Sequence, residues 1–549
     1  MRVEHAKLVV WAALIAGSAA IASCKQGRSA PGEVSRKWRP PHLESYMGVP
    51  AAETQAAIGR RLAADPPAPL TDDEWEHVNN LYGTFGQNLL WLDDKGVHQP
   101  RVVALLTALA NADSEAFRLD AYPLAALSRS LTAVEGKKPT ADQLATADVL
   151  LSAAFTAFGE QLLTGQQKPS SLGQAWHINP KEERVDSALA LTLRENDLAA
   201  GLARMRPQDP GYDSLRVHLG LLRRVLARGG WDSIAATPSK RRPGAIRARL
   251  SDEGYLGDSA SDSSGSLSAA ISSFQSHHNL ASTGKLNSET IEAMNVPVQY
   301  RLAQVAANME RFRWMPRSLG GRYILVNVPQ FKLTAFDSGV KTLEMKVIVG
   351  KDYEDKATPV FSDSMEYVIF RPYWNVTPDI AAKEIFPKGP EYLEANDMEV
   401  YNDHGREAVR QRPGPKNSLG LVKFMFPNDF NIYLHDTPNR ELFKKDMRAF
   451  SHGCIRVQKP AELAQWVLGW PLDKVESAMH GSNNHQVNLP EKIPVYIVYF
   501  TAFVSGGHVT YGNDLYDRDN ALVKQIADAA VPSEETVQAQ AALRALARD

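Results

Sequence analysis

The spacing of apolar residues predicts helices over the first part of the chain. Between residues 46 and 243, apolar side chains recur at intervals of three and four positions, most clearly over residues 102–112, 141–163 and 216–228. This spacing is typical of helices that bury one face. The same stretch shows no acidic pair, metal-binding spacing or phosphate-binding loop. We therefore interpret residues 46–243 as an all-α scaffold domain.

A second, smaller helical unit is predicted over residues 244–300. A short helix, a polar loop at residues 257–266 and two further helical patterns follow one another. The helical spacing places Ile271, Phe274 and Leu286 in a common core. This stretch therefore predicts a small three-helix module.

Beyond residue 321 the apolar period changes to two, which predicts strands. The alternation is clearest over residues 323–328, 332–336 and 343–349. Asp337-Ser338-Gly339 supplies a hairpin turn between the second and the third of these runs. Pro460 opens a helix further along, because proline suits the first position of a helix. We assign residues 301–519 to one mostly-β domain.

Within this domain the strand pattern stops between residues 376 and 420. Prolines punctuate this polar, partly helical stretch at Pro378, Pro387, Pro390, Pro413 and Pro415. An insertion of this length inside a compact domain is usually a functional lid or an irregular loop. Both interpretations are open from the residues themselves.

The beginning of the chain has the features of an export signal. Arg2 and Lys7 give it positive charge, and an apolar run of fourteen residues, 8–21, follows. This length suits a signal-peptide core and is short for a membrane span. The run ends in Ile21-Ala22-Ser23-Cys24, which resembles the lipobox of bacterial lipoproteins. We expect residues 1–24 to be a lipoprotein signal peptide with lipid on Cys24. The alternative is an ordinary secretory signal with an incidental cysteine.

Residues 25–45 are polar and contain prolines, which predicts a flexible linker from the membrane to the first domain. The lipobox implies a periplasmic protein that is lipid-anchored to a bacterial envelope membrane, and Lys25 favours the outer membrane over the inner one. At the other end, residues 520–549 are rich in alanine and polar residues. They predict a peripheral helix with a loose tail.

Composition narrows the class of protein. A chain of 549 residues is too long for one hydrophobic core, so about two to four domains are expected. The formal net charge is −2 and no long run of lysine and arginine occurs. A nucleic-acid-binding protein should show a basic stripe, so a nucleic-acid partner is not expected.

The cysteines point to candidate chemistry. If Cys24 carries lipid, Cys454 has no disulfide partner and is a candidate reactive thiol. It lies in Ser451-His452-Gly453-Cys454, and His435 stands nineteen positions before it. A thiol with a pKa of about 8.5 is mostly protonated at neutral pH. An imidazole can take that proton and later return it to a leaving amine. The alternative is an inert buried cysteine beside a solvent-facing histidine.

Metal catalysis is not expected. His452 and Cys454 are possible ligands, but zinc needs at least one more protein ligand at a suitable spacing. The chain contains neither Cys-x-x-Cys nor His-Glu-x-x-His. We therefore expect no metal and no other cofactor.

The order of these residues resembles the signature of the L,D-transpeptidases, the cysteine enzymes that cross-link bacterial peptidoglycan. In that family a histidine is followed, after about fourteen to seventeen residues, by Ser/Thr-His-Gly-Cys. The gap after His435 is fifteen residues. The phrases Asn88-Leu89-Leu90-Trp91 and Arg228-Gly229-Gly230-Trp231 resemble the N-terminal domain of the large, multidomain subclass. Tyr373-Trp374-Asn375 and Arg412-Pro413-Gly414-Pro415 resemble the flanks of its substrate-capping insertion.

The resemblance implies a multidomain α+β fold. Its parts are the all-α scaffold, a peptidoglycan-binding module at residues 244–300, and a mostly-β L,D-transpeptidase catalytic domain at residues 301–519. It also favours a substrate-capping lid for residues 376–420 over an irregular loop.

The resemblance further implies roles for individual residues. Cys454 is expected to be the nucleophile and His435 the general base and then acid, with His452 supporting the turn. Backbone N–H groups at Gly453 and Cys454 are expected to stabilise an oxyanion. The remaining expected substrate-binding residues are Arg456, Ser451, Tyr433, Trp374, Tyr373 and Asn375.

The roles of Arg456 and Asp436 have open alternatives. Arg456 is a planar, permanently charged donor that suits a stem-peptide carboxylate, but a structural ion pair is the alternative. Asp436 follows His435 directly and could orient the imidazole, but its side chain should point away from the ring if the strand continues.

The activity that the resemblance implies is 3→3 cross-linking of peptidoglycan between diaminopimelate residues. A tetrapeptide stem would acylate Cys454 and release D-Ala, and carbapenem β-lactams would be inhibitors. Alternatives at the same thiol are an L,D-carboxypeptidase and an enzyme that attaches or releases an envelope lipoprotein. A non-catalytic peptidoglycan-binding tether is a further alternative.

Overall fold

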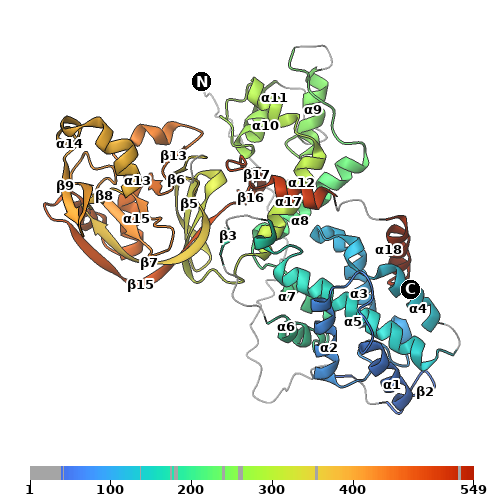
Figure 1. Cartoon of the computed structure of the whole chain (residues 1–549). Coiled ribbons are helices and arrows are strands. Elements are labelled where there is room, and N and C mark those ends of the chain that lie inside the picture. Colours follow the sequence, from blue (N-terminus) through green and yellow to red (C-terminus); the bar gives the residue numbers. More distant parts are fainter. Residues whose placement is uncertain are drawn as a thin grey trace, which may run out of the picture.

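The structure is a computed structural model of the whole chain. It describes residues 39–548 apart from 41–42, 136–137, 173–175, 179–183, 238–241, 257–263, 353–355 and 529–532. The expected signal peptide with Cys24, and most of the expected linker, lie outside the described residues. Figure 1 shows a helical part, a β-rich part and a smaller helical module, which confirms the predicted multidomain α+β architecture.

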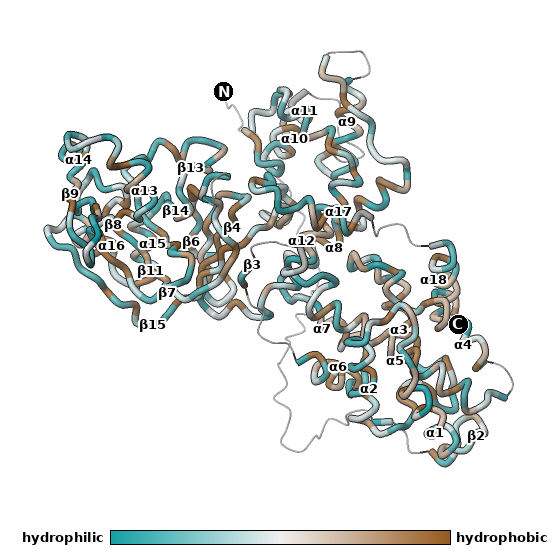
Figure 2. Tube along the Cα trace, viewed as in Figure 1, coloured by the Kyte–Doolittle hydropathy of each residue, from teal (hydrophilic) through white to brown (hydrophobic). Residues whose placement is uncertain are grey.

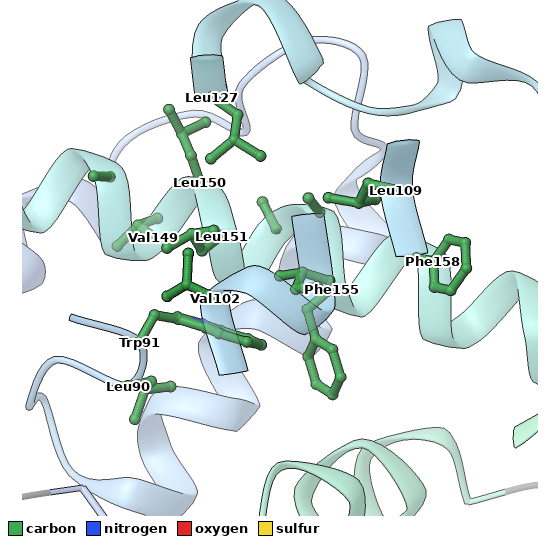
Figure 3. Close-up of a cluster of buried hydrophobic side chains, with 14 of the residues drawn as sticks. Leu90, Trp91, Val102, Leu109, Leu127, Val149, Leu150, Leu151, Phe155 and Phe158 are labelled. Atoms are coloured by element: carbon green, nitrogen blue, oxygen red, sulfur yellow. The ribbon is translucent and has the colours of Figure 1, made fainter. Parts of the chain in front are cut away.

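The scaffold is built around one long helix, α5. Its residues Ala141–Thr164 begin at a capping box of Thr140 and Gln143 and are buried along most of their length. Such a helix is apolar on all sides because other helices surround it. Figure 3 shows its side chains Val149, Leu151 and Phe155 packed with those of neighbouring elements. The other helices of this part are α1 (Ala51–Leu62), α2 (Asp72–Phe85), α3 (Pro100–Ala110), α4 (Leu124–Val134), α6 (Val185–Leu193), α7 (Leu198–Met205) and α8 (Pro210–Ala227).

A buried carboxylate on α5 fixes a loop of the scaffold. Asp148 accepts hydrogen bonds from the Tyr82 hydroxyl at 2.6 Å and from three consecutive backbone N–H groups, those of Leu90, Trp91 and Leu92. Burial raises the pKa of Asp148 to about 6, although these bonds act in the opposite direction. The carboxylate thereby anchors the stretch Asn88-Leu89-Leu90-Trp91 to the central helix.

The C-terminal segment is more ordered than a loose tail. Helix α18 (Glu534–Leu546) packs on α3 and α4 and buries Leu543 in the scaffold core. Helix α17 (Asn520–Asp528) packs instead on the connecting helix α12. The predicted helix at residues 520–549 is thus present as two helices, and apolar burial holds both of them in place.

The small module consists of α9 (Arg242–Asp252), α10 (Ser264–His277) and α11 (Ser288–Met294). Ile271 and Phe274 are buried in its core as predicted, and Leu286 is partly buried against it. Helix α12 (Val298–Arg313) follows. It packs against α8 and against the hairpin of β16 (Ala502–Ser505) and β17 (His508–Tyr511), so it joins the module to the rest of the chain.

The β-rich part is a sheet that closes on itself. The strand order is β11-β12-β14-β6-β5-β4-β15-β7, and β11 also pairs with β7. A mostly apolar core fills the enclosed space. The strands are β4 (Arg322–Asn327), β5 (Lys332–Asp337), β6 (Val340–Gly350), β7 (Val360–Phe370), β11 (Val422–Met425), β12 (Leu434–His435), β14 (Ile455–Val457) and β15 (His485–Val498), with β13 (Ala449–Ser451) paired to β6. Two helices, α15 (Pro460–Leu468) and α16 (Leu472–His480), pack their apolar sides against the core.

The hairpin predicted at residues 337–339 is present between β5 and β6. Ser338 and Gly339 both have positive φ, 51° and 78°. This is the backbone that a two-residue turn between antiparallel strands needs. The helix predicted from Pro460 through Leu468 is α15.

The scaffold also contributes a strand to this sheet. β3 (Trp176–His177) pairs in parallel with the start of β7. The Trp176 ring meets the Trp314 ring at the end of α12, with centroids 5.2 Å apart. No periodicity marks a strand of two residues, so this link between the domains was not predicted.

Residues 376–420 form a small subdomain, called the lid below. Its sheet has the order β8-β10-β9, from β8 (Trp374–Asn375), β10 (Arg406–Gln411) and β9 (Met398–Asp403). Val376, Ala381, Ile385 and Val409 form its core. The sequence predicted no strands here. β9 buries no residue and β10 buries only Val409 and Gln411, so apolar residues do not alternate along these strands as they do where one whole face is buried.

The helical turns of the lid are short. They are α13 (Pro378–Ile380), the π-helical turn η6 (Ala381–Ile385), the 3₁₀ turn η7 (Phe386–Lys388) and α14 (Pro390–Ala395). Figure 2 shows polar and apolar residues interspersed along the helices and strands. Among the described residues, no helix has the length and apolar character needed to cross a membrane.

Candidate active site

Strand register gathers the candidate residues on one face. Lys423 on β11 pairs with His435 on β12, and His435 pairs with Arg456 on β14. Paired residues on adjacent strands point to the same side of a sheet. Phe424, Leu434 and Ile455 alternate with them and are fully buried in the core. The three polar side chains therefore lie on the opposite face, and Cys454, two residues before Arg456, shares it.

The turn before Cys454 requires glycine. Gly453 has φ +115°, and a Cβ atom there would lie 3.3 Å from Cδ1 of Ile432. Its N–H donates to Oγ of the buried Ser451 at 3.2 Å, and its carbonyl accepts from Oγ1 of Thr358 at 2.9 Å. Ser451 therefore shapes the turn. In this conformation the Ser451 hydroxyl accepts a hydrogen bond from the Gly453 N–H, the group that was predicted to stabilise an oxyanion.

Burial keeps the thiol of Cys454 in the uncharged form. Sγ donates to the carbonyl of Asn431 at 3.6 Å, and the Tyr433 side chain also hydrogen-bonds the thiol. Burial raises the pKa of Cys454, and the Tyr433 bonds and the charges of Lys423 and Arg456 only partly offset it. Cys454 is therefore a thiol rather than a thiolate at neutral pH.

His435 is oriented by the backbone. Its Nδ1 lies 2.5 Å from the carbonyl oxygen of Asp436. A carbonyl can only accept, so Nδ1 carries the proton and Nε2 is the basic nitrogen. Burial lowers the pKa of His435 to about 3, and the positive charges of Arg456 and Lys423 act in the same direction. At neutral pH the imidazole is an unprotonated base.

The Asp436 side chain does not orient the imidazole. Its carboxylate accepts from the Leu421 N–H at 2.9 Å and from Arg440 at 3.2 Å. The side chain of Asp436 thus points away from His435. The part of Asp436 that contacts the ring is its backbone carbonyl.

Two cations flank the thiol. Nζ of Lys423 lies 3.7 Å from the centre of the Tyr433 ring. Nε of Arg456 is buried without a hydrogen-bond partner, and Arg456 forms no ion pair with any residue that the structure describes. Burial lowers the pKa of both side chains, and each interacts electrostatically with Cys454. The face therefore presents positive charge beside the nucleophile.

The lid reaches the nucleophile turn through Glu384 on η6. Its Oε1 lies 2.6 Å from Nε2 of His452 and 3.4 Å from Nζ of Lys356. The hydrogen bond from His452 is the main reason that the pKa of Glu384 is lowered. The His452 imidazole is thus engaged with the lid, and a role as a second base on the thiol is not indicated.

Of the three predicted residues at the lid flank, Trp374 and Asn375 lie in the lid sheet and Tyr373 directly precedes it. The Tyr373 ring faces the Arg410 guanidinium, which is 4.7 Å from its centre. Trp374 packs against the lid core, and the exposed Asn375 pairs through its backbone with Arg410. Their contacts in the structure are therefore with the lid.

Sequence reasoning missed Lys423, Asn431, Thr358, Lys356 and Glu384. Alternation over Lys423-Phe424-Met425 shows which of these side chains leaves the core, but only the strand pairing shows that Lys423 stands beside His435. The other four act across loops and the lid, for which the sequence contains no signal.

Comparisons with known proteins match three parts of the chain to family models. Residues 321–497 match the family model of the L,D-transpeptidase catalytic domain, which contains both His435 and Cys454. Residues 76–219 match the family model described as "Scaffold domain", and residues 242–294 match the one described as "Putative peptidoglycan binding domain".

A protein of Haemophilus influenzae named "Putative L,D-transpeptidase" is 30% identical over 242 residues, which are 40% of this chain and 48% of that protein. The match thus spans about half the length of this relative. Two solved structures are also similar. One is an L,D-transpeptidase from Xylanimonas cellulosilytica, with 15% identity, a TM-score of 0.16, and coverage of 49% of this chain and 97% of that one.

The other is the carbamoyl enzyme of Ldtfm with avibactam, with 12% identity, a TM-score of 0.16, and coverage of 34% of this chain and 51% of that one. These structural similarities are too low to carry an argument, and the family matches identify the domains. The chain therefore contains an L,D-transpeptidase catalytic domain, joined to a scaffold domain and a peptidoglycan-binding domain.

Proposed function

We propose that this protein is a cysteine-dependent L,D-transpeptidase that forms 3→3 cross-links between diaminopimelate residues of peptidoglycan. The observation that carries the proposal is the shared face of β12 and β14. It holds an unprotonated His435 whose Nε2 is the basic nitrogen, the Cys454 thiol, and a positive charge from Arg456.

In the first half-reaction, the Cys454 sulfur attacks the carbonyl carbon of the bond between diaminopimelate and D-Ala in a tetrapeptide stem. His435 Nε2 takes the thiol proton as the sulfur–carbon bond forms. The C–N bond of the tetrahedral intermediate then breaks, and His435 returns the proton to the departing nitrogen of D-Ala. A thioester on Cys454 remains.

In the second half-reaction, the side-chain amine of diaminopimelate on a neighbouring stem attacks the thioester. His435 takes a proton from this amine, the C–S bond breaks, and the proton returns to the sulfur. Water in place of the amine would give hydrolysis, which is the L,D-carboxypeptidase alternative. Both outcomes use the same thiol, base and acyl-enzyme.

Arg456 is proposed to bind a carboxylate of the stem peptide. Its Nε is buried and has no hydrogen-bond partner. A buried donor without a partner is unfavourable, so a carboxylate ligand would satisfy it. Arg456→Ala should raise the KM for stem peptide. A lower kcat at unchanged KM would contradict this role.

The activity is tested with residues 25–549 incubated with purified disaccharide-tetrapeptide and analysed by mass spectrometry, with Cys454→Ala beside it. A dimer lighter by one D-Ala that is absent from the variant would establish the transpeptidase. Loss of D-Ala without a dimer would identify a carboxypeptidase. No change in either sample would favour the non-catalytic tether. A lipoprotein-attaching or lipoprotein-releasing enzyme would act only when that lipoprotein is supplied.

Two further proposals concern inhibitors and location. Carbapenems should acylate Cys454, which intact-mass analysis of wild type and Cys454→Ala would detect as an adduct on the wild type alone.

The lipobox ending at Cys24 supports a periplasmic, lipid-anchored protein. Labelling with radioactive palmitate that persists in Cys24→Ala would contradict the anchor.

A further inference from the structure

A cavity of about 490 Å³ lies where three parts of the chain meet. One wall comes from the peptidoglycan-binding domain, with Asn279 after α10 and Glu292 on α11. Tyr300 and Arg301 of α12 also line the cavity. The catalytic domain supplies a wall that includes Asp446. Its volume is in the range of sites that bind small ligands.

The lining is polar and carries net negative charge. Four carboxylates line the cavity, those of Glu289, Glu292, Asp446 and Asp514, against one cation, Arg301. Burial lowers the pKa of His278, which also lines the cavity, to about 3, so this residue is neutral. Glu289, Glu292 and Asp446 are exposed, so their carboxylates can accept hydrogen bonds from a ligand. The cavity therefore disfavours an anionic ligand.

Arg301, which lines the cavity, contains a buried donor without a partner. Arg301 is 7% exposed, and its Nη1 donates to Gln304 at 2.8 Å while its guanidinium lies over the Tyr511 ring. Its Nε is buried and has no hydrogen-bond partner. Such a nitrogen is stabilised when a ligand oxygen accepts from it.

We propose that this cavity binds the glycan strand of peptidoglycan, so that the peptidoglycan-binding and catalytic domains hold one strand together. Neutral sugars with hydroxyl and acetamido groups both donate and accept, which suits a lining of carboxylates, amides and a free N–H. Stem peptides carry several carboxylates, and the acidic lining would repel them.

The cavity is connected to the turn with Cys454 through a short segment of chain. Asp446 lies on the segment that leads through β13 into the turn with Cys454. A strand bound beside this segment would keep its stem peptides near the nucleophile and raise their local concentration. This inference rests on the proposed function for the identity of the ligand, but the cavity itself does not depend on it.

The test is equilibrium binding of chitotetraose, a neutral oligomer of N-acetylglucosamine, to the full chain carrying Cys454→Ala. This parent is compared with a variant that also carries Glu292→Ala/Asp446→Ala, which removes one exposed acceptor from each of the two domains. We expect the double variant to bind at least about tenfold more weakly, because each lost hydrogen bond weakens binding severalfold. The control is Asp473→Ala/Glu476→Ala, which removes two exposed carboxylates from α16, and its affinity should equal that of the parent.

Equal affinity in the cavity variant and the parent, or no binding of chitotetraose to the parent, would overturn the proposal. The same variants with Cys454 restored should release D-Ala from soluble disaccharide-tetrapeptide at the wild-type rate. On intact sacculi the cavity variant alone should be slower. If wild type releases no D-Ala from the soluble substrate, the proposed function fails while the glycan site stands or falls on the binding data.

Discussion

Nε2 of His452 lies 2.6 Å from Oε1 of Glu384, and this contact joins the lid to the turn that carries the nucleophile. Glu384 belongs to a π-helical turn, a rare backbone that often marks functional sites. Lys356, from the loop between β6 and β7, reaches the same carboxylate oxygen at 3.4 Å. The lid is therefore held near Cys454 by one carboxylate and two basic side chains.

Glu384→Gln should weaken this link between the lid and the nucleophile turn. A neutral amide attracts a basic imidazole and an ammonium less strongly than a carboxylate does. We expect the KM for disaccharide-tetrapeptide to rise about three- to tenfold with a smaller change in kcat, because the role proposed for the lid is to position substrate. Steady-state release of D-Ala measures both constants.

Asp379→Asn is the matched control for this prediction. Asp379 forms an exposed ion pair with Lys383 in the same part of the lid, with side chains about two-thirds exposed. Exposed pairs contribute little, so its KM should match wild type. Equal KM values for Glu384→Gln and wild type would contradict the prediction that the lid takes part in substrate binding.

Lys423→Met should make Cys454 less reactive. The positive charge of Lys423 lowers the pKa of the thiol, and its removal leaves the effect of burial less opposed. We expect alkylation by iodoacetamide at pH 7.5 to slow about three- to tenfold, which corresponds to a pKa rise of about half to one unit. The exposed Lys445→Met serves as the control. A faster reaction in Lys423→Met would contradict the electrostatic argument.

Below neutral pH, the rate of acylation should not fall with the pKa of about 6.5 that is usual for histidine. The folded pKa of His435 is about 3, so the base stays unprotonated between pH 7 and 5. For a histidine with a pKa of 6.5, the fraction in the base form would fall about 25-fold over that range. We expect less than about a twofold change in the rate of carbapenem acylation, measured by intact mass.

The same shift has a consequence for stability. Between about pH 6.5 and 3 the unfolded chain binds a proton at His435 that the folded chain does not, so acid should lower the free energy of unfolding. Circular dichroism at each pH separates unfolding from loss of activity. In Arg456→Ala the pKa of His435 should rise, because a neighbouring positive charge is removed.

The prediction on acylation would be contradicted if the acylation rate of wild type fell to half near pH 6.5, because His435 would then titrate like an exposed histidine.

Asp148→Asn should destabilise the scaffold. The carboxylate accepts from Tyr82 and from three backbone N–H groups, and an amide would point a donor at some of them. We expect a loss of about 2–3 kcal/mol in the free energy of unfolding. Calorimetry measures the shift. Asp142→Asn, which removes an exposed ion pair on the same helix, should lose less than about 1 kcal/mol.

Local sequence patterns predicted much of the fold. Helical spacing indicated the scaffold around residues 141–163, and the tight turn at Asp337-Ser338-Gly339 placed the first hairpin of the sheet. These features follow from short-range rules, since each needs only the burial of one face or a turn of fixed backbone. Strands β9 and β10 were not predicted, because β9 buries no residue and Val409 is the only apolar residue that β10 buries.

The sequence by itself determined the chemical types at the site and their order: a histidine, fifteen residues, then Ser-His-Gly-Cys. Tertiary structure alone decided which side chains surround the thiol. The pairing of β11, β12 and β14 brings Lys423, His435 and Arg456 to one face, and the lid brings Glu384 to His452. Burial then sets the protonation of His435 and Cys454, because desolvation depends on what covers a group and not on its neighbours in sequence.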